Sequence, residues 1–324
     1  MSTLKEKINK AIKYRKEFFD SNDTTAFRVV NNDGDNIDGL TIDYYDGYYL
    51  ITWYLEKLYL QKDIIVDVLK SAPNFKGIYQ KNRFNSTKNY IKDESDFVLS
   101  IDNNSAPEPL IIKENGVKFN IYLDDGAMTG IFLDQKDVRK TIRDKYSHGK
   151  TMLNTFSYTG AFSIYSALGG AKQTTSVDLA NRSLPKTKEQ FEVNNIDPNT
   201  QNIIVQDVFG YFKFALRKGY FYDLIVLDPP SFARTKKRTF SVQKDYINLL
   251  KEAIAITNKD GVIVASTNSS KVSIRDFKGF VKTAFGQSNT KYEIVETFGL
   301  PKDFKVNPNN PSSNYLKVLF VKKI

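Results

Sequence analysis

The chain has 324 residues, 41% of them hydrophobic and 26% charged, which is the ordinary composition of a globular protein. Its length suits an α/β domain of about 200 residues together with a smaller domain. Because the chain has no cysteine and only one histidine, disulfides, a cysteine nucleophile and zinc sites built from cysteine are excluded, and we expect no metal ion.

The single histidine, His148, lies in the turn-like sequence Ser-His-Gly at 147–149, which favours a solvated loop residue over a catalytic one. The apolar runs are only a few residues long, whereas a membrane span needs about 18 or more. The lysine-rich residues 1–16 contain no apolar core of a secretory signal. We therefore expect a cytoplasmic protein without membrane contact. The sequence gives no indication of oligomeric state.

The net charge of +10 is unevenly distributed along the chain. Residues 126–324 hold 30 lysines and arginines against 17 acidic residues, a net charge of +13, whereas residues 1–125 have a net charge of −3. A basic excess of this kind suits a polyanionic partner and would steer its approach. Charge alone does not distinguish such a partner from a surface that only keeps the protein in solution.

Residues 1–125 are predicted to form a small α+β domain. A helix is expected over the first ~20 residues, where Leu4, Ile8 and Ile12 recur at helical spacing. Short strands then alternate with turn sequences such as Asp-Gly at 33–34 and 46–47. The predicted strands cover residues 27–30, 39–43, 48–54, 77–80 and 117–122, with a helix over 58–69 and a loop over 102–109.

Residues 126–324 are predicted to form a Rossmann-like α/β domain, in which strands and helices alternate from about residue 150. The predicted strands cover 151–156, 174–179, 202–206, 223–227 and 262–266, and the helices between them cover 161–168, 181–194, 208–218 and 240–257. Such alternation indicates a parallel sheet covered by helices on both faces. Two closing β runs, 292–297 and 315–321, predict an antiparallel hairpin added to that sheet, which is the arrangement of class I methyltransferases.

Unusual residues follow the predicted strands, at the edge where open α/β sheets bind their ligands. After the first strand comes Asn-Thr-Phe-Ser-Tyr-Thr-Gly at 154–160, in which Gly160 allows a tight turn and the close approach of a ligand. Only one glycine is present, so the dinucleotide motif and hydride transfer are disfavoured. Asp178, 18 residues further on, ends the second strand, where such folds bind ribose hydroxyls.

Two more strands end in an aspartate. Asp207, followed by Val208, is placed to accept a hydrogen bond from an adenine amino group, although it could instead only cap the next helix. Asp228 ends the fourth strand and begins Asp-Pro-Pro. A glycine turn, an acid for the ribose, an acid for the adenine and Asp-Pro-Pro together fit an adenosyl sulfonium cofactor, S-adenosylmethionine (SAM).

The most specific feature is Asp-Pro-Pro-Ser-Phe at 228–232. Two prolines fix the backbone and leave its carbonyl groups as acceptors for a substrate. Phe232 adds an aromatic surface that suits a planar base removed from its stack. The next residues hold four cations within five positions, which would contact phosphates beside a base pocket, unless the run is only a solvated loop. These RNA-binding candidates are Arg234, Lys236, Lys237 and Arg238.

These segments resemble the class I rRNA methyltransferases of the RlmI/RlmK type, and the similarity extends over nearly the whole chain. The resemblance rests above all on Thr-Gly-Ile-Phe-Leu-Asp-Gln at 129–135, on residues 154–160 and on Asp-Pro-Pro-Ser-Phe. It implies that residues 154–160 and Asp178 hold the cofactor and that residues 130–135 lie across it. The candidate cofactor-binding residues are Phe132, Asn154, Phe156, Ser157, Tyr158, Thr159, Gly160, Asp178, Leu179, Asp207, Val208 and Asp228.

Family members that make 5-methylcytosine carry an N-terminal PUA domain and a cysteine nucleophile after the fifth strand. The sequence has no cysteine, and we expect no PUA domain in this protein. The equivalent stretch, 265–270, reads Ala-Ser-Thr-Asn-Ser-Ser. Because carbon 5 of cytosine reacts only after a thiolate adds to the ring, that chemistry is closed to this chain. This stretch and Gln-Lys-Asp at 243–245 look more like the branch that methylates guanine N7.

The leading hypothesis is therefore a SAM-dependent enzyme that methylates guanine N7 in 23S ribosomal RNA. N7 carries an in-plane lone pair, so its methylation needs positioning and charge stabilisation rather than a general base. One alternative is methylation of an exocyclic amine, guanine N2 or adenine N6, and another is an RNA-binding or ribosome-assembly factor without activity. The candidate catalytic residues are Asp228, Pro229, Pro230, Ser231, Phe232 and Asn268.

Overall fold

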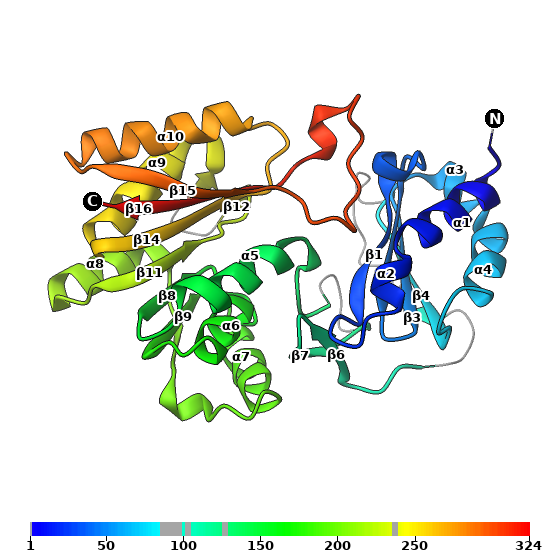
Figure 1. The fold of residues 1–324 in the computed structure, drawn as a ribbon, viewed down its shortest axis with the longest axis horizontal. Helices are drawn as coiled ribbons and strands as arrows, with labels where there is room; N and C mark the ends of the chain where they lie inside the picture. Colours follow the sequence, from blue (N-terminus) through cyan, green and yellow to red (C-terminus); the bar gives the residue numbers. More distant parts are fainter. Residues whose placement is uncertain (1, 85–98, 101–104, 125–128, 235–238) are drawn as a thin grey trace. The chain divides into compact units, whose positions relative to one another are not determined.

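The structure is a computed structural model, and it describes residues 2–84, 99–100, 105–124, 129–234 and 239–324 (Figure 1). The chain divides into two compact units. The first contains Met1–Lys136 and Pro301–Ser313, and the second contains Asp137–Leu300 and Asn314–Ile324. This division differs from the expected domains, 1–125 and 126–324, because the first unit extends to residue 136 and recovers a segment near the C-terminus. The return of residues 301–313 to the first unit cannot be recognised from the periodicity of the local sequence.

The first unit is built on a sheet with the strand order β1-β2-β3-β4-β5, in which β3 and β4 are parallel and the other neighbours antiparallel. Side chains of α1 and α4, such as Ile8 and Ile65, pack with Phe27 and Tyr49 of the sheet in one core. The elements of this unit are α1 (Leu4–Tyr14), α2 (Lys16–Phe19), β1 (Ala26–Asn31), β2 (Leu40–Tyr45), β3 (Tyr48–Trp53), α3 (Glu56–Tyr59), α4 (Lys62–Lys70), β4 (Gly77–Asn82), β5 (Leu99–Ser100), β6 (Leu110–Glu114) and β7 (Val117–Ile121).

Several details of this unit depart from the sequence-based expectation. The first ~20 residues and residues 58–69 each form two short helices rather than one. A strand at β6 was not expected; it pairs with β7 in an antiparallel hairpin. Its turn is Asn115-Gly116, both with positive φ angles (50° and 81°), and Asn-Gly is the sequence signal of such a hairpin. That signal was present and could have predicted β6.

The second unit contains a sheet with the strand order β10-β9-β8-β11-β14-β16-β15. The first five of these strands are parallel, and β16 is antiparallel to both β14 and β15, as predicted. The elements are α5 (Lys136–Thr141), β8 (Thr151–Thr155), α6 (Ala161–Leu168), β9 (Gln173–Asp178), α7 (Ser183–Glu192), β10 (Asn202–Val205), α8 (Val208–Lys218), β11 (Tyr222–Leu227), β12 (Phe232–Arg234), β13 (Thr239–Ser241), α9 (Val242–Ala255), β14 (Thr257–Thr267), α10 (Ile274–Gln287), β15 (Tyr292–Phe298) and β16 (Lys317–Lys323).

Helices cover both faces of this sheet (Figure 1). Successive residues of a strand point to opposite faces, so Ile225 packs in the core formed with α8, α9 and α10, whereas its neighbours Leu224 and Val226 pack in the core formed with α5 and α6. The strands are therefore apolar on both sides, as expected for a buried parallel sheet. The helix α10 was not among the predicted elements, although Ser273 and Asp276 form a capping box at its start.

In the parts of the chain that the structure describes, no helix is both long and apolar enough to cross a membrane.

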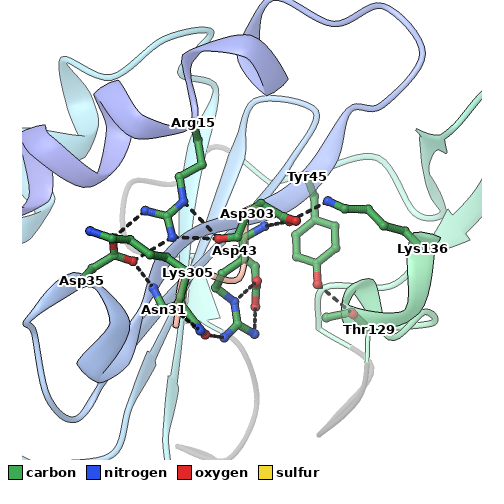
Figure 2. A network of polar contacts seen from close by, with 10 residues as sticks. Arg15, Asn31, Asp35, Asp43, Tyr45, Thr129, Lys136, Asp303 and Lys305 are labelled. Carbon is green, nitrogen blue, oxygen red and sulfur yellow. Dashed lines mark hydrogen bonds and ion pairs between the residues drawn. The ribbon is translucent and has the colours of Figure 1, made fainter. Parts of the chain in front are cut away.

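A buried network of charged groups fixes the segment Pro301–Ser313 within the first unit (Figure 2). The Arg15 guanidinium donates to both carboxylate oxygens of Asp35 (2.6 and 2.8 Å) and to the backbone carbonyl of Asp303 (2.7 and 3.1 Å). The Asp303 carboxylate pairs with Lys136 Nζ (2.6 Å) and accepts the Arg28 backbone N–H (2.9 Å). Arg15 and Asp303 are completely buried.

The backbone also approaches closely at this network. A Cβ atom on Gly34 would lie 1.8 Å from the Lys305 carbonyl oxygen, so only glycine fits at position 34. Asn31 Nδ2 donates to the same carbonyl oxygen (2.9 Å). The segment 301–313 is thus held by ion pairs and by main-chain contacts to residues almost 300 positions earlier in the chain.

We predict that Arg15→Met strongly destabilises the first unit. Removing one partner of a buried ion pair leaves an uncompensated charge and costs about 3–5 kcal/mol. The measurement is the free energy of unfolding in urea. Lys16→Met is the matched control, because Lys16 pairs with Asp20 on the surface and such exposed pairs contribute about 0–1 kcal/mol. Equal stabilities of the two variants would contradict a structural role for the network.

In the second unit, Asp223 ties together the beginnings of three neighbouring strands. Its Oδ2 accepts from the backbone N–H of Thr151 (2.9 Å) and from the Thr151 hydroxyl (3.0 Å), and its Oδ1 accepts from Asn258 Nδ2 (2.9 Å). Partial burial acts to raise the pKa of the Asp223 carboxyl, but these hydrogen bonds and the charge of Lys150 together hold that pKa below its ordinary value. The ionised form of Asp223 is therefore favoured in the folded protein.

We predict that Asp223→Ala lowers the free energy of unfolding by about 1–3 kcal/mol at pH 7, the usual cost of leaving buried partners unsatisfied. Because the pKa of Asp223 is lowered by folding, its stabilisation is present above the unfolded-state pKa of about 3.9 and is lost as the pH falls through the folded-state pKa. Urea unfolding from pH 7 to pH 3 should show the difference between wild type and variant shrinking. A difference that grows on acidification would refute this assignment.

Candidate active site at the carboxyl ends of the parallel strands

The carboxyl ends of β8, β9, β10, β11 and β14 meet at one edge of the sheet, because these five strands are parallel. The residues singled out from the sequence follow these ends. They are residues 156–160 after β8, Asp178 and Leu179 at the end of β9, Asp207 after β10, Asp228 after β11 and Asn268 after β14. The topology thus places the candidates from five separate segments of this unit at a single edge.

The loop between β8 and α6 is tightly turned. Phe156, Tyr158 and Gly160 all have positive φ angles (54°, 51° and 79°). Gly160 has no room for a side chain, since a Cβ atom would lie 2.6 Å from Thr187 Cγ2. The Ser157 backbone N–H donates to the Val177 carbonyl (3.1 Å), which fastens the loop to β9. Positive φ at two aromatic residues costs free energy, and other contacts must hold the loop in this shape.

Asp178 provides such contacts. Its Oδ2 accepts the backbone N–H of Tyr158 (2.9 Å), and its Oδ1 accepts the backbone N–H of Ala180 (2.9 Å). A carboxylate has about four lone-pair positions, so two remain for a ligand. Asp178 is half-buried at the strand end. It therefore anchors the loop and can also accept two hydroxyl groups.

Several side chains of the loop segment lie inside the unit rather than on its surface. Asn154 is buried, and its Nδ2 donates to Ser163 Oγ (3.1 Å). Ser157 and Thr159 are also buried, whereas Phe156 and Tyr158 are half-buried. A ligand at this loop would therefore meet mainly its backbone and the two aromatic rings.

The sequence left two roles open for Asp207, a contact to adenine and the cap of the following helix, and the structure shows the cap. Asp207 Oδ2 accepts the backbone N–H of Gly210 (2.9 Å), so it is the N-cap of α8. The residue is exposed, and a cap uses only part of its acceptor capacity. Val208 is buried, but the Leu179 side chain is 52% exposed and offers an apolar surface at the same edge.

Asp228 is held from the neighbouring strand. Its Oδ1 accepts a hydrogen bond from the Ser266 hydroxyl near the end of β14. Behind it, the buried Tyr246 donates its hydroxyl to the Ser266 carbonyl (2.8 Å). Burial, with a further effect from the charge of Asp228, raises the pKa of the Tyr246 phenol, so that it remains a donor. Ser266 and Tyr246 thus fix the position of Asp228.

The loop after Asp228 is joined to the loop after β14. Ser231 Oγ donates to Asn268 Oδ1 (2.6 Å), which brings two candidate catalytic residues into direct contact across 37 sequence positions. Pro229 is buried and Pro230 is exposed. Lys317 Nζ donates to the Ser269 carbonyl (2.9 Å) and supports the same loop.

Phe232 and Arg234 lie on β12, which pairs with β13 in a short antiparallel hairpin. The Phe232 ring is 64% exposed, and Arg234 is exposed as well. The other predicted phosphate contacts, Lys236, Lys237 and Arg238, lie outside the described residues. Asp245, from the Gln-Lys-Asp sequence at 243–245, accepts the Ser241 backbone N–H (2.8 Å) at the start of α9.

Phe132 belongs to the first unit, where its side chain is 49% exposed next to a short 3-10 turn, Leu133–Gln135. Its predicted cofactor contact therefore stays a prediction. The roles of Ser266 and Tyr246 were missed by the sequence analysis. Ser266 lies in the stretch that resembles a cysteine-bearing segment of the family, but nothing local marks Tyr246, because it lies on α9 and its partners are on β11 and β14.

The described residues contain no group of three or more His, Cys, Asp or Glu side chains that could hold a metal ion.

Comparison with known proteins gives a consistent result. The family model of S-adenosylmethionine-dependent methyltransferases matches residues 29–320. The Bacillus subtilis (strain 168) protein "Putative ribosomal RNA large subunit methyltransferase YwbD" is 55% identical over 318 residues, which are 98% of this chain and 79% of that protein. "Ribosomal RNA large subunit methyltransferase I" of Aeromonas salmonicida (strain A449) is 30% identical over 92% of this chain and 74% of that protein.

A solved structure agrees with these relatives. The crystal structure of SMU.776, "a putative methyltransferase complexed with SAH", is 43% identical and superposes with a TM-score of 0.88 over 97% of this chain and 81% of that one. The expected class I fold and the expected cofactor are thereby confirmed. With its parallel sheet, its antiparallel closing strands and its polar strand ends, the chain belongs to the family of S-adenosylmethionine-dependent methyltransferases.

Proposed function

We propose that this enzyme methylates N7 of a guanine in 23S ribosomal RNA, in the cytoplasm. The relatives named above, which span almost the whole chain, support a large-subunit rRNA as the substrate. The proposal of N7 as the methylated atom rests mainly on the site at the end of β11. There, an aspartate fixed by Ser266 stands before two prolines and an exposed phenylalanine, in a chain without cysteine.

The cofactor supplies an electrophilic methyl group on a positively charged sulfur. Guanine N7 attacks with a lone pair that lies in the ring plane, so the protein does not have to remove a proton first. Its tasks are to hold the base in line with the methyl group and to offset the positive charge that develops on the ring. We assign the second task to the carboxylate of Asp228, and base positioning to Pro229, Pro230 and the Ser231–Asn268 pair, with Phe232 as a stacking surface.

We assign cofactor binding to the loop 154–160 with Asp178, Leu179, Asp207 and Val208, and phosphate contacts to Arg234, Lys236, Lys237 and Arg238. Asp178 fits a ribose because it has two acceptor positions left after anchoring the loop. Leu179 fits the flat face of an adenine because it is exposed at the adjoining position. Exposed Asp207 has acceptor capacity for the adenine amino group beyond its cap.

The cofactor assignment predicts that Asp178→Ala lowers the affinity for SAM at least tenfold. Hydrogen bonds to a charged group contribute about 1.5–3 kcal/mol each, and two are lost. Calorimetric titration with SAM measures the effect. Asp197→Ala is the matched control, because Asp197 also accepts a backbone N–H in a loop, from Asn199 (2.9 Å), but lies before β10 at the other edge of the sheet.

Because Asp178 also anchors Tyr158, the free energy of unfolding of the variant is measured alongside the titration. A folded Asp178→Ala protein with wild-type affinity for SAM would remove Asp178 from the cofactor site. Weaker binding in both variants would point to a general loss of loop structure instead.

The second prediction concerns the product. With labelled SAM and large-subunit rRNA, the wild-type enzyme should yield RNA that is cleaved at the labelled nucleotide by borohydride and aniline, which act at 7-methylguanosine. Asp228→Ala should transfer label at least 100-fold more slowly, on the scale lost with one stabilising group in a transition state. RNA containing 5-fluorocytidine should form no covalent adduct, because no thiolate is present.

Labelled RNA that resists cleavage and yields N2-methylguanosine or N6-methyladenosine would replace the N7 assignment by the exocyclic-amine alternative. Failure to label naked rRNA, large subunits and assembly intermediates alike would reject rRNA as the substrate and favour an assembly role.

A further inference from the structure

Several cations of the second unit lie at the edge of the sheet opposite the candidate active site. Lys172 precedes β9, Lys150 precedes β8, Lys259 lies at the start of β14 and Lys291 precedes β15. Neighbouring strands are about 4.8 Å apart, so these cations form a row along the sheet edge. Backbone hydrogen bonds join the loops that carry them, from Lys172 N–H to the Lys150 carbonyl (2.8 Å) and from Ile324 N–H to the Lys291 carbonyl (3.0 Å). We call these four residues the lysine row.

Of the lysine row, Lys150 contributes to the fold through its charge, which helps to keep Asp223 ionised. All four side chains are exposed, and none forms an ion pair with any residue that the structure describes. Two further lysines at the same edge behave differently. Lys322 pairs with Asp260 (3.1 Å), and Lys323 Nζ donates to backbone carbonyls at the end of α9 and the start of β14. Those two cations are therefore held by direct contacts of the fold.

Two exposed aromatic rings lie in the middle of this row. Tyr220 and Phe221 precede β11, the strand between β8 and β14, and are 49% and 46% exposed. Phe214 contacts the Tyr220 ring edge to face at 5.9 Å and supports it from α8. Arg217 and Lys218 add two cations beside the rings, although cations at a helix C-terminus also stabilise the helix itself.

Aromatic rings between exposed cations suit single-stranded or looped nucleic acid, since bases stack on the rings while lysines contact phosphates. The acidic residues near this edge offset only part of its positive charge. Asp260 is paired with Lys322, and Asp223 is bonded to Thr151 and Asn258 and feels the charge of Lys150. Asp197 precedes the outermost strand, β10, and exposed Glu293 lies on β15 two residues from Lys291. A symmetric contact between two copies of the chain would bring lysine row against lysine row, which like charges disfavour.

We propose that the lysine row with Tyr220 and Phe221 is a second RNA-binding surface of this enzyme. That the RNA is ribosomal rests on the proposed function. Strand β11 has six residues, so the two edges of the sheet are about 20 Å apart. A dinucleotide at the active site would not reach this surface. The proposal therefore implies that the substrate is a large folded RNA that contacts the second unit at both edges.

The test compares three variants of the full chain. In the first, Lys172, Lys259 and Lys291 of the lysine row and Lys218 beside the rings are replaced by glutamine, and Lys150 is kept because its charge also favours ionised Asp223. In the second, Tyr220→Ser and Phe221→Ser are combined. The control replaces four exposed lysines of the first unit, Lys5, Lys10, Lys57 and Lys70, by glutamine and so removes the same charge. Binding is measured by fluorescence anisotropy from 50 to 300 mM KCl. The two probes are a large-subunit rRNA transcript and a ten-nucleotide single strand.

The lysine variant should bind the transcript at least tenfold more weakly than the control. Its log–log salt slope should fall by about 3, since each lost phosphate contact contributes roughly 0.7–0.9. The aromatic variant should bind about fivefold or more weakly with an unchanged slope, because stacking carries no counterion release. Calorimetric SAM affinity should stay at the wild-type value in both. The ten-nucleotide strand contacts fewer groups than the transcript, so its affinity should fall by a smaller factor.

Equal transcript binding by the lysine variant and the control, with no effect of the aromatic variant, would overturn the proposal. So would unchanged RNA affinity together with a lower sedimentation coefficient, which would identify the surface as an interface between copies of the chain. The binding assay does not depend on methyl transfer, so it tests the second surface separately from the substrate. If rRNA is not the substrate, the wild-type protein could still bind the transcript but would transfer no label to it.

Discussion

The parallel alignment of β8, β9, β10, β11 and β14 is the constraint on which the candidate site depends. Backbone hydrogen bonds in the register Thr155 to Val177 and Thr155 to Leu227 bring the ends of three strands level, although these residues lie up to 72 positions apart. Each strand then continues into a loop at the same edge, where backbone amide groups and carboxylates are not used for hydrogen bonds between strands. In that setting a few polar residues become a binding site without any change in the packing of the core.

Carboxylates at this edge hold the surrounding loops in place, and the proposed site gives them a second role as acceptors for a ligand. Asp178 uses two acceptor positions to fix Tyr158 and Ala180, and Asp207 uses one to cap α8. Asp228 is fixed in turn by Ser266, whose carbonyl receives the Tyr246 hydroxyl. An acceptor that is already held in place loses little further freedom when a ligand binds, so its hydrogen bond contributes more to affinity. Positioning groups such as Ser266 and Tyr246 therefore belong to the site although they need not touch the ligand.

The first unit meets a different requirement, that of holding a distant segment of chain. A purely apolar contact would bury 301–313 without selecting one register, whereas Arg15 with Asp35 and Lys136 with Asp303 fit only when both partners are aligned. Such a network costs desolvation and adds specificity rather than much net stability. The second unit shows the opposite use of charge. Its lysine row stays in water and forms no ion pair with the described residues, although the charge of Lys150 favours ionised Asp223, and its exposed cations are available to a polyanion.

The sequence by itself determined the fold class of the second unit and most of its elements, because alternating apolar runs and helical periodicity are local properties of the chain. The positions of Gly160, Asp178, Asp207 and Asp228 could also be recognised in the sequence, since each follows the end of a predicted strand. The lack of cysteine followed from composition alone. Only the tertiary structure decided that Ser231 bonds Asn268, that Ser266 and Tyr246 support Asp228, that 301–313 returns to the first unit, and that scattered lysines form one row. These features depend on the strand order β10-β9-β8-β11-β14-β16-β15, which is set by the joint packing of all the elements and leaves no periodic pattern in any one of them.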